Sequence, residues 1–447
     1  MTDTSVRPPE SAPRPGEPRG EVAGEPWRVT LLAVGALAIG IFGGVGWAIM
    51  IFALLFMIFL HELGHYVTAK WSGMKVTEFF LFFGPKIWSF RRGETEYGIK
   101  LIPLGAYVRI IGMSNMDTEV APEDEPRTYR QQSYPKRLLV VSAGSIMHVL
   151  QAVVLFFLAF SVLGISGGSD LGQRLGGEDP PAVIDEIAEG SGAAGAGIEP
   201  GDAITQLDGE TVGSFEDLGP LLDGRAGDTV PVVVDRDGSQ VELQVTLGSR
   251  EESPDDGLLG VTRAGVEVPN VRVNPLTGAN QALQMTGVGI RDTATNLVGF
   301  FANDLGDFGR SVADGTSAEG PTVGTGGSGG DTGGSRPPQE GDDKRLMSLP
   351  GIARIGAAIT EEGLGEFLVF MALINLSLGV LNMLPLLPLD GGHVVIATYE
   401  RLRSFGGRRH MADVSRLIPL TYAVLLFFLV ISMSAIYLDI RDPIGLG

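Results

Sequence analysis

Cysteine is absent from the 447 residues of the chain. Its absence excludes disulfide bonds and thiolate metal ligands, so any zinc ion must be held by His, Asp or Glu side chains. The start of the chain also lacks the short basic region and apolar core that mark a signal peptide. Residues 1–26 are instead rich in Pro, Gly and Glu without hydrophobic periodicity, and we expect them to form a disordered tail.

Positive charge is scarce in the chain as a whole. It contains 33 Lys and Arg against 53 Asp and Glu, which gives a formal net charge of −20. Most of the acidic excess follows residue 169, so nucleic acid is not expected as a partner of that region. Hydrophobic residues make up 44% of the chain, and the mean hydropathy is +0.21. These values indicate a multi-span membrane protein with soluble insertions, whose core segments lie in the lipid bilayer.

Long apolar runs are what the sequence has in abundance. The first is nearly uninterrupted from Val29 to Leu60 but holds several glycines near its middle. It is either one long, tilted helix or two spans, at about 29–45 and 47–70. We therefore expect a polytopic α-helical membrane protein with four core spans, or five. The regions that contain the apolar runs are 27–72, 138–165, 363–395 and 417–438.

The charges that flank these runs predict how the chain crosses the membrane. The connection from Lys70 to Arg137 and the segment from Arg401 to Arg416 are rich in Lys and Arg, whereas residues 166–341 are acidic. By the positive-inside tendency, the first and third connections are cytoplasmic and the large second one is extracytoplasmic. The expected location is the cell (plasma) membrane, which the chain crosses several times.

A pentapeptide with zinc-ligand spacing lies at the end of the first apolar region. In His61-Glu62-Leu63-Gly64-His65 one helical turn separates the two histidines, so both imidazoles can reach a single zinc ion. Glu62 is then placed to act on a water molecule. Two imidazoles and a carboxylate at membrane depth are unfavourable without partners, which favours a functional site over a chance match.

A second motif follows the third apolar run. The sequence from Asn382 to Gly392 reads Asn-Met-Leu-Pro-Leu-Leu-Pro-Leu-Asp-Gly-Gly, and its two prolines predict a broken or re-entrant segment. If the spans that precede the two motifs both run inward, Asp390 lies at the depth of His61 and His65 and is a natural third zinc ligand. The alternative is a loop outside the membrane in which the Asp-Gly pair forms an ordinary turn.

The region 73–115 is predicted to form β-hairpins associated with the membrane. Short apolar stretches alternate there with turn signals such as Gly84-Pro85, Arg92-Gly93 and Pro103-Leu104-Gly105. Strands that directly follow the zinc helix can lie beside the site and offer an edge to an unwound substrate. A plain hairpin with no role in binding is an equally economical interpretation.

A compact α+β module is expected outside the cytoplasm at residues 169–249. Residues 250–314 form an extracytoplasmic, juxtamembrane region whose pattern is less clear, and the Gly-rich stretch 315–345 is a flexible linker. Within the module we expect a short helix and four strands; the helix lies at 191–198 and the strands at 181–187, 201–209, 230–234 and 241–247.

The two motifs, in this order and with a PDZ-like module at 169–249 between them, resemble the site-2 protease family of intramembrane zinc metalloproteases. The resemblance covers nearly the whole chain from about residue 47. It implies a zinc-dependent endopeptidase that cleaves single-span membrane proteins in regulated intramembrane proteolysis. Typical substrates in the family are anti-sigma factors already trimmed by an upstream site-1 protease.

Shorter motifs narrow the resemblance. Three segments are similar to the actinobacterial branch of the bacterial members, and Gly201-Asp202 and Asp208-Gly209 resemble the matching positions of PDZ domains in the family. The three segments are Arg92-Gly93-Glu94-Thr95-Glu96-Tyr97-Gly98, Pro103-Leu104-Gly105 and Glu400-Arg401-Leu402-Arg403.

The resemblance also assigns roles to site residues. It implies that His61, His65 and Asp390 are the zinc ligands and that Glu62 is the general base. Asn382 is implied to bind the substrate or the developing oxyanion.

The second span departs from the family pattern. Where Ala-Gly-Pro-x-x-Asn is usual, this chain has Ala143-Gly144-Ser145-Ile146-Met147-His148. We favour His148 as a histidine that is satisfied by contacts between helices, and the alternatives are a group that supports the zinc ligands or an accidental ligand. His393, just after the Gly-Gly pair, has the same ambiguity.

A catalytically inactive membrane scaffold is the alternative function. Its PDZ-like module would recruit partners, and its zinc site would be vestigial. Glu62 beside three candidate ligands argues against this alternative, because a scaffold has no need of a general base. A zinc transporter is less favoured still, because the chain offers one clustered site and no ladder of intramembrane carboxylates.

Overall fold

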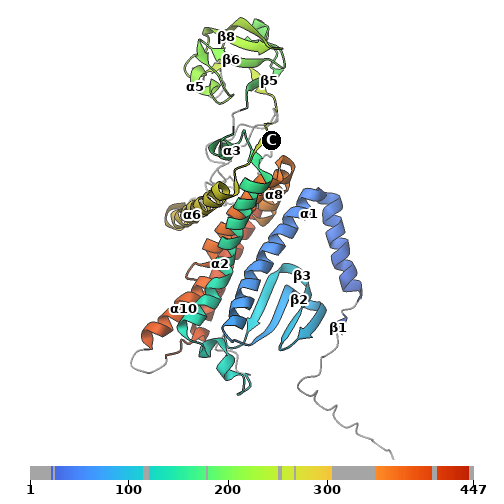
Figure 1. The fold of residues 1–447 in the computed structure, drawn as a ribbon, viewed down its shortest axis with the longest axis vertical. Helices are drawn as coiled ribbons and strands as arrows, with labels where there is room; N and C mark the ends of the chain where they lie inside the picture. The colour runs from blue at the N-terminus through green and yellow to red at the C-terminus, as the bar shows by residue number, and fades with distance from the viewer. Residues whose placement is uncertain are drawn as a thin grey trace, which may run out of the picture. The chain divides into compact units, whose positions relative to one another are not determined.

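The computed structural model describes residues 22–23, 26–113, 120–177, 180–249, 254–265, 268–304, 348–404 and 410–441, drawn as a ribbon in Figure 1. The chain forms two compact units. The first comprises residues 1–149 and 378–429, and the second comprises residues 150–377 and 430–447. The linker predicted at 315–345 and most of the tail predicted at 1–26 lie outside the described residues.

The first unit begins with a long bent helix, α1 (Pro26–Trp71). Its backbone leaves the helical region at Gly44, where φ is 78° and ψ is 177°, a conformation that favours glycine. Figure 1 shows the resulting change of direction between two helical arms. The single continuous helix considered for the first apolar region is therefore wrong, because its Gly-rich stretch breaks the helix.

A small sheet follows α1 in the chain and packs against it. Its two long strands bend, so that the first half of β2 lies between the two halves of β3. Phe79 pairs with Tyr97 on one side and with Val108 on the other. The strands are β1 (Val22–Ala23), β2 (Val76–Arg92) and β3 (Thr95–Ile110). The expected lack of structure in 1–26 is wrong at β1, because the edge of β2 offers backbone groups that a short extended segment satisfies.

Four helices in the described part of the chain are long and apolar enough to cross a membrane. The protein is therefore a multi-pass membrane protein with four candidate core spans, and a fifth span is not shown among the described residues. The candidate spans are Gly44–Trp71, Tyr134–Leu163, Leu364–Asn382 and Val414–Arg441. The elements that form the last three spans are α2 (Tyr134–Leu158), η3 (Ala159–Leu163), α9 (Leu364–Asn382), η6 (Val414–Leu417) and α11 (Ile418–Arg441). Two short 3-10 helices, η1 (Glu125–Arg127) and η2 (Tyr129–Gln131), precede α2.

The third span ends where the second motif begins. α9 ends at Asn382, and a new helix, α10 (Asp390–Arg403), begins at Asp390. The region 363–395 is therefore a span followed by a turn and the start of a second helix, because its two prolines cannot continue α9. Gly391 permits this turn, since a Cβ atom there would overlap backbone carbonyl groups of the turn itself.

The second unit contains the PDZ-like module. Its sheet has the strand order β12-β5-β6-β8-β9, with β7 paired to β6, and its core is formed by buried aliphatic side chains such as Ile184, Leu207 and Val232. The elements are β5 (Ala182–Ile187), α4 (Gly192–Ala196), β6 (Ala203–Leu207), β7 (Glu210–Thr211), α5 (Leu218–Leu222), β8 (Thr229–Arg236), β9 (Ser239–Thr246) and β12 (Val261–Arg263).

The module extends further along the chain than 169–249. β12 adds to the outer side of β5, so part of the region 250–314 belongs to the module's sheet. A 25-residue helix, α6 (Pro275–Gly299), occupies much of the rest. The other elements of this unit are β4 (Ile165–Ser166), α3 (Asp170–Arg174), β10 (Gly248–Ser249), β11 (Gly257–Leu258), β13 (Asn270–Val271), η4 (Phe300–Asp304) and α8 (Leu349–Glu362).

Candidate metal centre

Two histidines of α1 lie one above the other on a single face of the helix. The side chains of His61 and His65 are buried, and their Nε2 atoms lie 3.2 Å apart. The spacing of four residues produces this approach, because successive turns of a helix stack their side chains.

The backbone of α2 fixes the orientation of His65. The Nδ1 atom of this residue lies 2.7 Å from the carbonyl oxygen of Val140. A carbonyl group only accepts hydrogen bonds, so Nδ1 carries the proton and Nε2 keeps its lone pair. Outer hydrogen bonds of this kind support most metal-binding histidines. The sequence gives no sign of Val140 as a partner, because a carbonyl group is common to all residues.

Asp390, at the first position of α10, completes a cluster of three possible ligands. Its Oδ2 atom lies 3.6 Å from Nε2 of His61 and 3.4 Å from Nε2 of His65. A tetrahedral zinc ion with ligands at about 2.0–2.1 Å separates its ligand atoms by roughly 3.3 Å. The three atoms are therefore spaced as the ligands of one zinc ion would be.

The Oδ2 atom of Asp390, which is buried although the residue as a whole is partly exposed, supports the same interpretation. This atom has no hydrogen-bond donor with suitable geometry in the part of the chain that the structure describes. A buried acceptor without a partner is unfavourable, and a cation between the two imidazoles and the carboxylate would satisfy it. Two neutral imidazoles and one carboxylate are also a donor set that zinc accepts, so the residues present fit the ion.

Glycines bring α1 and α2 close together around this cluster. A Cβ atom at Gly144 of α2 would overlap the ring of His61 and the Nε2 atom of His65. On α1, a Cβ atom at Gly64 would lie 2.8 Å from the carbonyl oxygen of Ala143. Small residues at both positions allow the close helix packing that is common between membrane helices. Gly144 thus has a role at the site that its place in the sequence motif did not reveal.

Glu62 lies beside the cluster without belonging to it. Its carboxyl group is close enough to interact electrostatically with His65 and Asp390, and the backbone of Val108 in β3 is within hydrogen-bonding reach of it. The sheet therefore holds a carboxyl group next to the possible metal position. A general base must have this placement, near the reacting water but not bound to the metal.

A buried ion pair joins α10 to α2. The Nη2 atom of Arg137 lies 2.7 Å from Oε2 of Glu400, and the two side chains are 9% and 5% exposed. The other carboxylate oxygen of Glu400 accepts a hydrogen bond from the backbone of Ala412. Because α10 begins with Asp390, this pair holds the helix that presents the third ligand. The sequence does not reveal the pair, since its members are far apart along the chain.

Three further candidates have different positions. His148 is buried in α2, and its ring centroid lies 4.9 Å from that of His61. His393 lies within the first turn of α10, and Asn382 is the last residue of α9; both are partly exposed. None of the three belongs to the ligand cluster found among the described residues, which consists of His61, His65 and Asp390. The roles of all three stay predictions.

The chain is similar to known proteins over most of its length. The model of Peptidase family M50 matches residues 49–313 and 338–429. The zinc metalloprotease Rip1 of Mycobacterium bovis is 32% identical over 415 residues, which cover 88% of this chain and 96% of that protein. The protein of the same name from Mycolicibacterium smegmatis is 32% identical over 429 residues, which cover 90% and 99%. Among solved structures, the PDZ domain of an SdrC-like protein from Listeria innocua matches 20% of this chain, with 20% identity and a TM-score of 0.18.

Proposed function

Because the chain belongs to peptidase family M50 and is a zinc metalloendopeptidase of the site-2 protease type, we propose that it cleaves single-span membrane proteins at the cluster of His61, His65 and Asp390. The observation that carries this proposal is the convergence of three ligand atoms beside the carboxyl group of Glu62. All four residues belong to the first compact unit.

The two histidines would hold the zinc ion through Nε2, and Asp390 would hold it through Oδ2. Three protein ligands leave one position open, as in catalytic rather than structural zinc sites. When bound there, zinc supplies Lewis-acid chemistry, which polarises the scissile carbonyl and makes water a competent nucleophile near neutral pH.

Glu62 is the residue that we assign as the general base. Its carboxylate takes a proton from the attacking water as the new C–O bond forms, and it delivers that proton to the amine nitrogen as the C–N bond breaks. Asn382 is assigned to the substrate, where its amide N–H groups would donate to the peptide or to the developing oxyanion.

The sheet offers a place for the unwound substrate. A transmembrane helix hides its peptide bonds within its own hydrogen bonds, so cleavage requires local unwinding. Among the described residues, the segment 106–110 of β3 has a strand partner on one side only. The backbone of Val108 in this segment is within hydrogen-bonding reach of the Glu62 carboxyl group. An extended substrate segment paired with this edge would satisfy its own backbone groups beside the general base.

We further propose that the substrates are pretrimmed anti-sigma factors, cut first by an upstream site-1 protease, and that the PDZ-like module is extracytoplasmic. The resemblance of the motifs supports the first statement, and the charge asymmetry around the spans supports the second. The module would either bind the new C-terminus left by the first cut or exclude intact ectodomains by their size.

Removal and return of the metal tests the proposed chemistry. Protein purified in detergent and freed of zinc by a chelator should lose cleavage of a single-span reporter with a short ectodomain, and added zinc should restore it. Magnesium serves as the control and should not restore cleavage, because it prefers six oxygen ligands to a pair of imidazoles. Full activity in protein shown to be free of zinc would contradict the proposal.

A further inference from the structure

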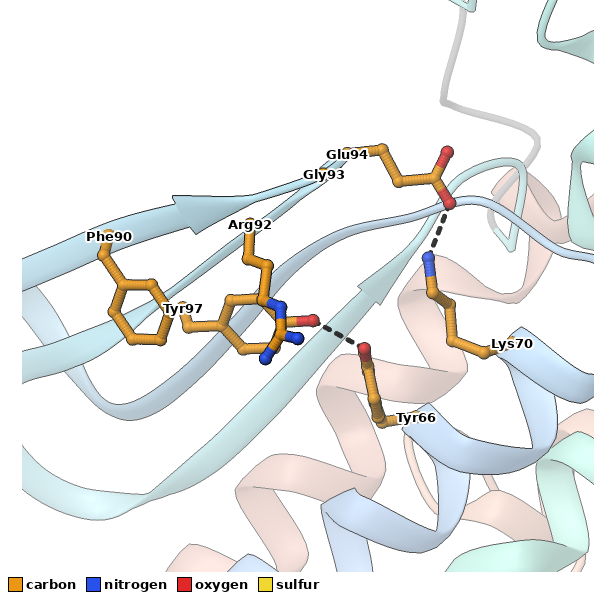
Figure 2. Close-up of a pocket in the computed structure, with 7 residues that line it drawn as sticks. All are labelled: Tyr66, Lys70, Phe90, Arg92, Gly93, Glu94 and Tyr97. Carbon is orange, nitrogen blue, oxygen red and sulfur yellow. Dashed lines mark hydrogen bonds and ion pairs between the residues drawn. The ribbon is translucent and has the colours of Figure 1, made fainter. Parts of the chain in front are cut away.

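A cavity of about 620 Å³ lies at the end of α1, against the tip of the β2–β3 hairpin (Figure 2). None of its lining residues belongs to the ligand cluster, and the proposed reaction uses none of them. The side chains that line it are Tyr66, Lys70, Phe90, Arg92, Glu94 and Tyr97.

The cavity lies at the level where a membrane span meets water. The candidate span Gly44–Trp71 ends one residue after Lys70, so Lys70 belongs to its last turn. Trp71 is 81% exposed, as is typical of an aromatic side chain in the headgroup layer of a bilayer. A lipid that reaches the cavity at this level would offer its headgroup rather than its acyl chains.

The charges of the lining favour an anionic ligand. Glu94 is its one carboxylate, and it already has two cationic partners: Lys70 at 2.6 Å, and Arg127 through two hydrogen bonds of 2.6 and 2.7 Å. The hydrogen bond from Arg127 and then Lys70 lower the pKa of Glu94 to about 2, so this carboxylate stays ionised. Its negative charge is balanced by these two cationic partners. The positive charge of Arg92 is therefore not balanced, because Arg92 forms no ion pair with the described residues.

Aromatic side chains complete the lining. The rings of Phe90 and Tyr97 are stacked with centroids 5.3 Å apart, and the hydroxyl oxygens of Tyr66 and Tyr97 lie 2.5 Å apart. Only one hydroxyl of such a pair donates to the other, so one hydroxyl proton is left for a ligand. In Figure 2 the side chain of Arg92 points to the side of the cavity where the two hydroxyls meet. A guanidinium beside a hydroxyl donor suits a phosphate group, and the ring faces suit apolar carbon atoms.

We propose that this cavity binds the phosphate headgroup of an anionic phospholipid, with Arg92 as its main anchor and the tyrosine pair as a further donor. A ligand there contacts both α1 and the hairpin, and the same sheet places Val108 at Glu62. Occupation therefore stabilises the sheet against the helix that carries the active site, and anionic lipid raises cleavage. The effect on cleavage rests on the proposed function, whereas the binding does not.

Lipid retention by the full-length protein tests the binding. The wild type, Arg92→Glu and Arg91→Glu are each placed in mixed micelles that contain phosphatidylglycerol or phosphatidylcholine. Native mass spectrometry then measures how much of each lipid stays bound to each protein. Arg91→Glu is the matched control, because it makes the same charge change at an exposed neighbour that does not line the cavity. We expect the wild type and the control to retain phosphatidylglycerol about fivefold better than phosphatidylcholine, and Arg92→Glu to show a ratio near one.

A second variant shows whether a loss of lipid preference could come from misfolding instead. Arg92→Gln removes the charge and leaves a shorter, neutral, polar side chain, and it should lower the retention ratio while its melting temperature in phosphatidylcholine stays that of the wild type. Inorganic phosphate separates the two sources of a phosphate group. If phosphate alone raises the melting temperature through Arg92 and phosphatidylglycerol adds nothing, the anion is free phosphate.

Three results would overturn the lipid site. The first is a wild type with no preference for phosphatidylglycerol. The second is an equal loss of this preference in Arg91→Glu and Arg92→Glu. The third is cleavage that does not depend on the lipid but prefers acidic over basic reporter substrates, with Arg92→Glu reversing this preference, which would assign the cavity to the substrate. Retained lipid preference in a protein that cleaves no reporter would instead contradict the proposed function alone.

Discussion

Gly144 leaves free the space between α2 and the two imidazoles of α1. A methyl group at this position would overlap ring atoms of His61 and the Nε2 atom of His65. We therefore predict that Gly144→Ala weakens zinc binding by roughly 5- to 150-fold, because overpacking of a tight contact costs about 1–3 kcal/mol. Zinc titration of the purified, metal-free protein measures this change.

Gly287→Ala is the matched control for this substitution. Gly287 lies in α6, and a Cβ atom there would meet no heavy atom within 4 Å. The control should bind zinc as the wild type does. Wild-type affinity in Gly144→Ala would show that the imidazoles do not need this space and would contradict the geometry of the site.

Single residues of the site were predictable to different degrees. The spacing of His61 and His65 is visible in the sequence because a helix converts it directly into proximity. The third candidate, Asp390, needed the second motif and the order of the spans, since more than three hundred residues separate it from α1. The carbonyl group of Val140 could not be predicted, because only the register of α2 against α1 selects it.

At the scale of elements, the placement of α10 depends on the ion pair between Arg137 and Glu400. Removal of one partner leaves the other charge buried, which costs about 3–5 kcal/mol. We predict that Glu400→Gln lowers the melting temperature of the protein and also its zinc affinity, because α10 carries Asp390. Glu361→Gln in α8 is a suitable control, since its side chain is exposed. A variant that melts earlier but binds zinc as the wild type does would show that the pair does not position the ligand.

The PDZ-like module has its own charge-dependent stability. Arg236 donates to both carboxylate oxygens of the buried Asp202 at 2.7 Å, and this interaction lowers the pKa of Asp202 below its ordinary value of 3.8. A group whose pKa is lower in the folded state stabilises the fold above the unfolded pKa and loses this effect as the pH falls. The module should therefore lose stability below about pH 4.

Asp202→Asn should remove that part of the pH dependence. Hydrogen exchange of the module's amides in the full-length protein measures its local stability at pH 6 and at pH 3. We expect the variant to be less stable than the wild type at pH 6, by about 1.5–3 kcal/mol, and the difference to shrink at pH 3. An undiminished difference at pH 3 would show that the ionised form of Asp202 is not what Arg236 stabilises.

Elements with a strong periodic pattern were predictable, and those that depend on tertiary packing were not. The apolar runs and the alternating stretch after α1 indicated spans and strands. Helix α6 escaped prediction because its buried face consists of small residues, Gly278, Ala282 and Thr286, which give little hydrophobic contrast. β12 has three residues, too few for a pattern, and only its pairing with β5 makes it a strand.

At the scale of the whole molecule, the proposed orientation in the membrane is open to a direct test. The chain has no cysteine, so each substitution by cysteine introduces a single thiol. Ser239→Cys, at the exposed start of β9 in the PDZ-like module, should react with a membrane-impermeant maleimide in intact cells. Arg91→Cys, in the hairpin, should react only after the membrane is permeabilised. Labelling of the hairpin but not the module in intact cells would reverse the proposed topology.

The most direct test of the proposed active site compares the wild type with Glu62→Gln. Both purified proteins are given a single-span reporter with a short ectodomain, and the zinc content of both is measured. We predict equal zinc occupancy and a loss of cleavage of about 10²- to 10⁴-fold in Glu62→Gln, because the substitution removes the general base and keeps the ligands. Equal cleavage by the two proteins at equal zinc content would contradict the assignment of Glu62 and with it the proposed mechanism.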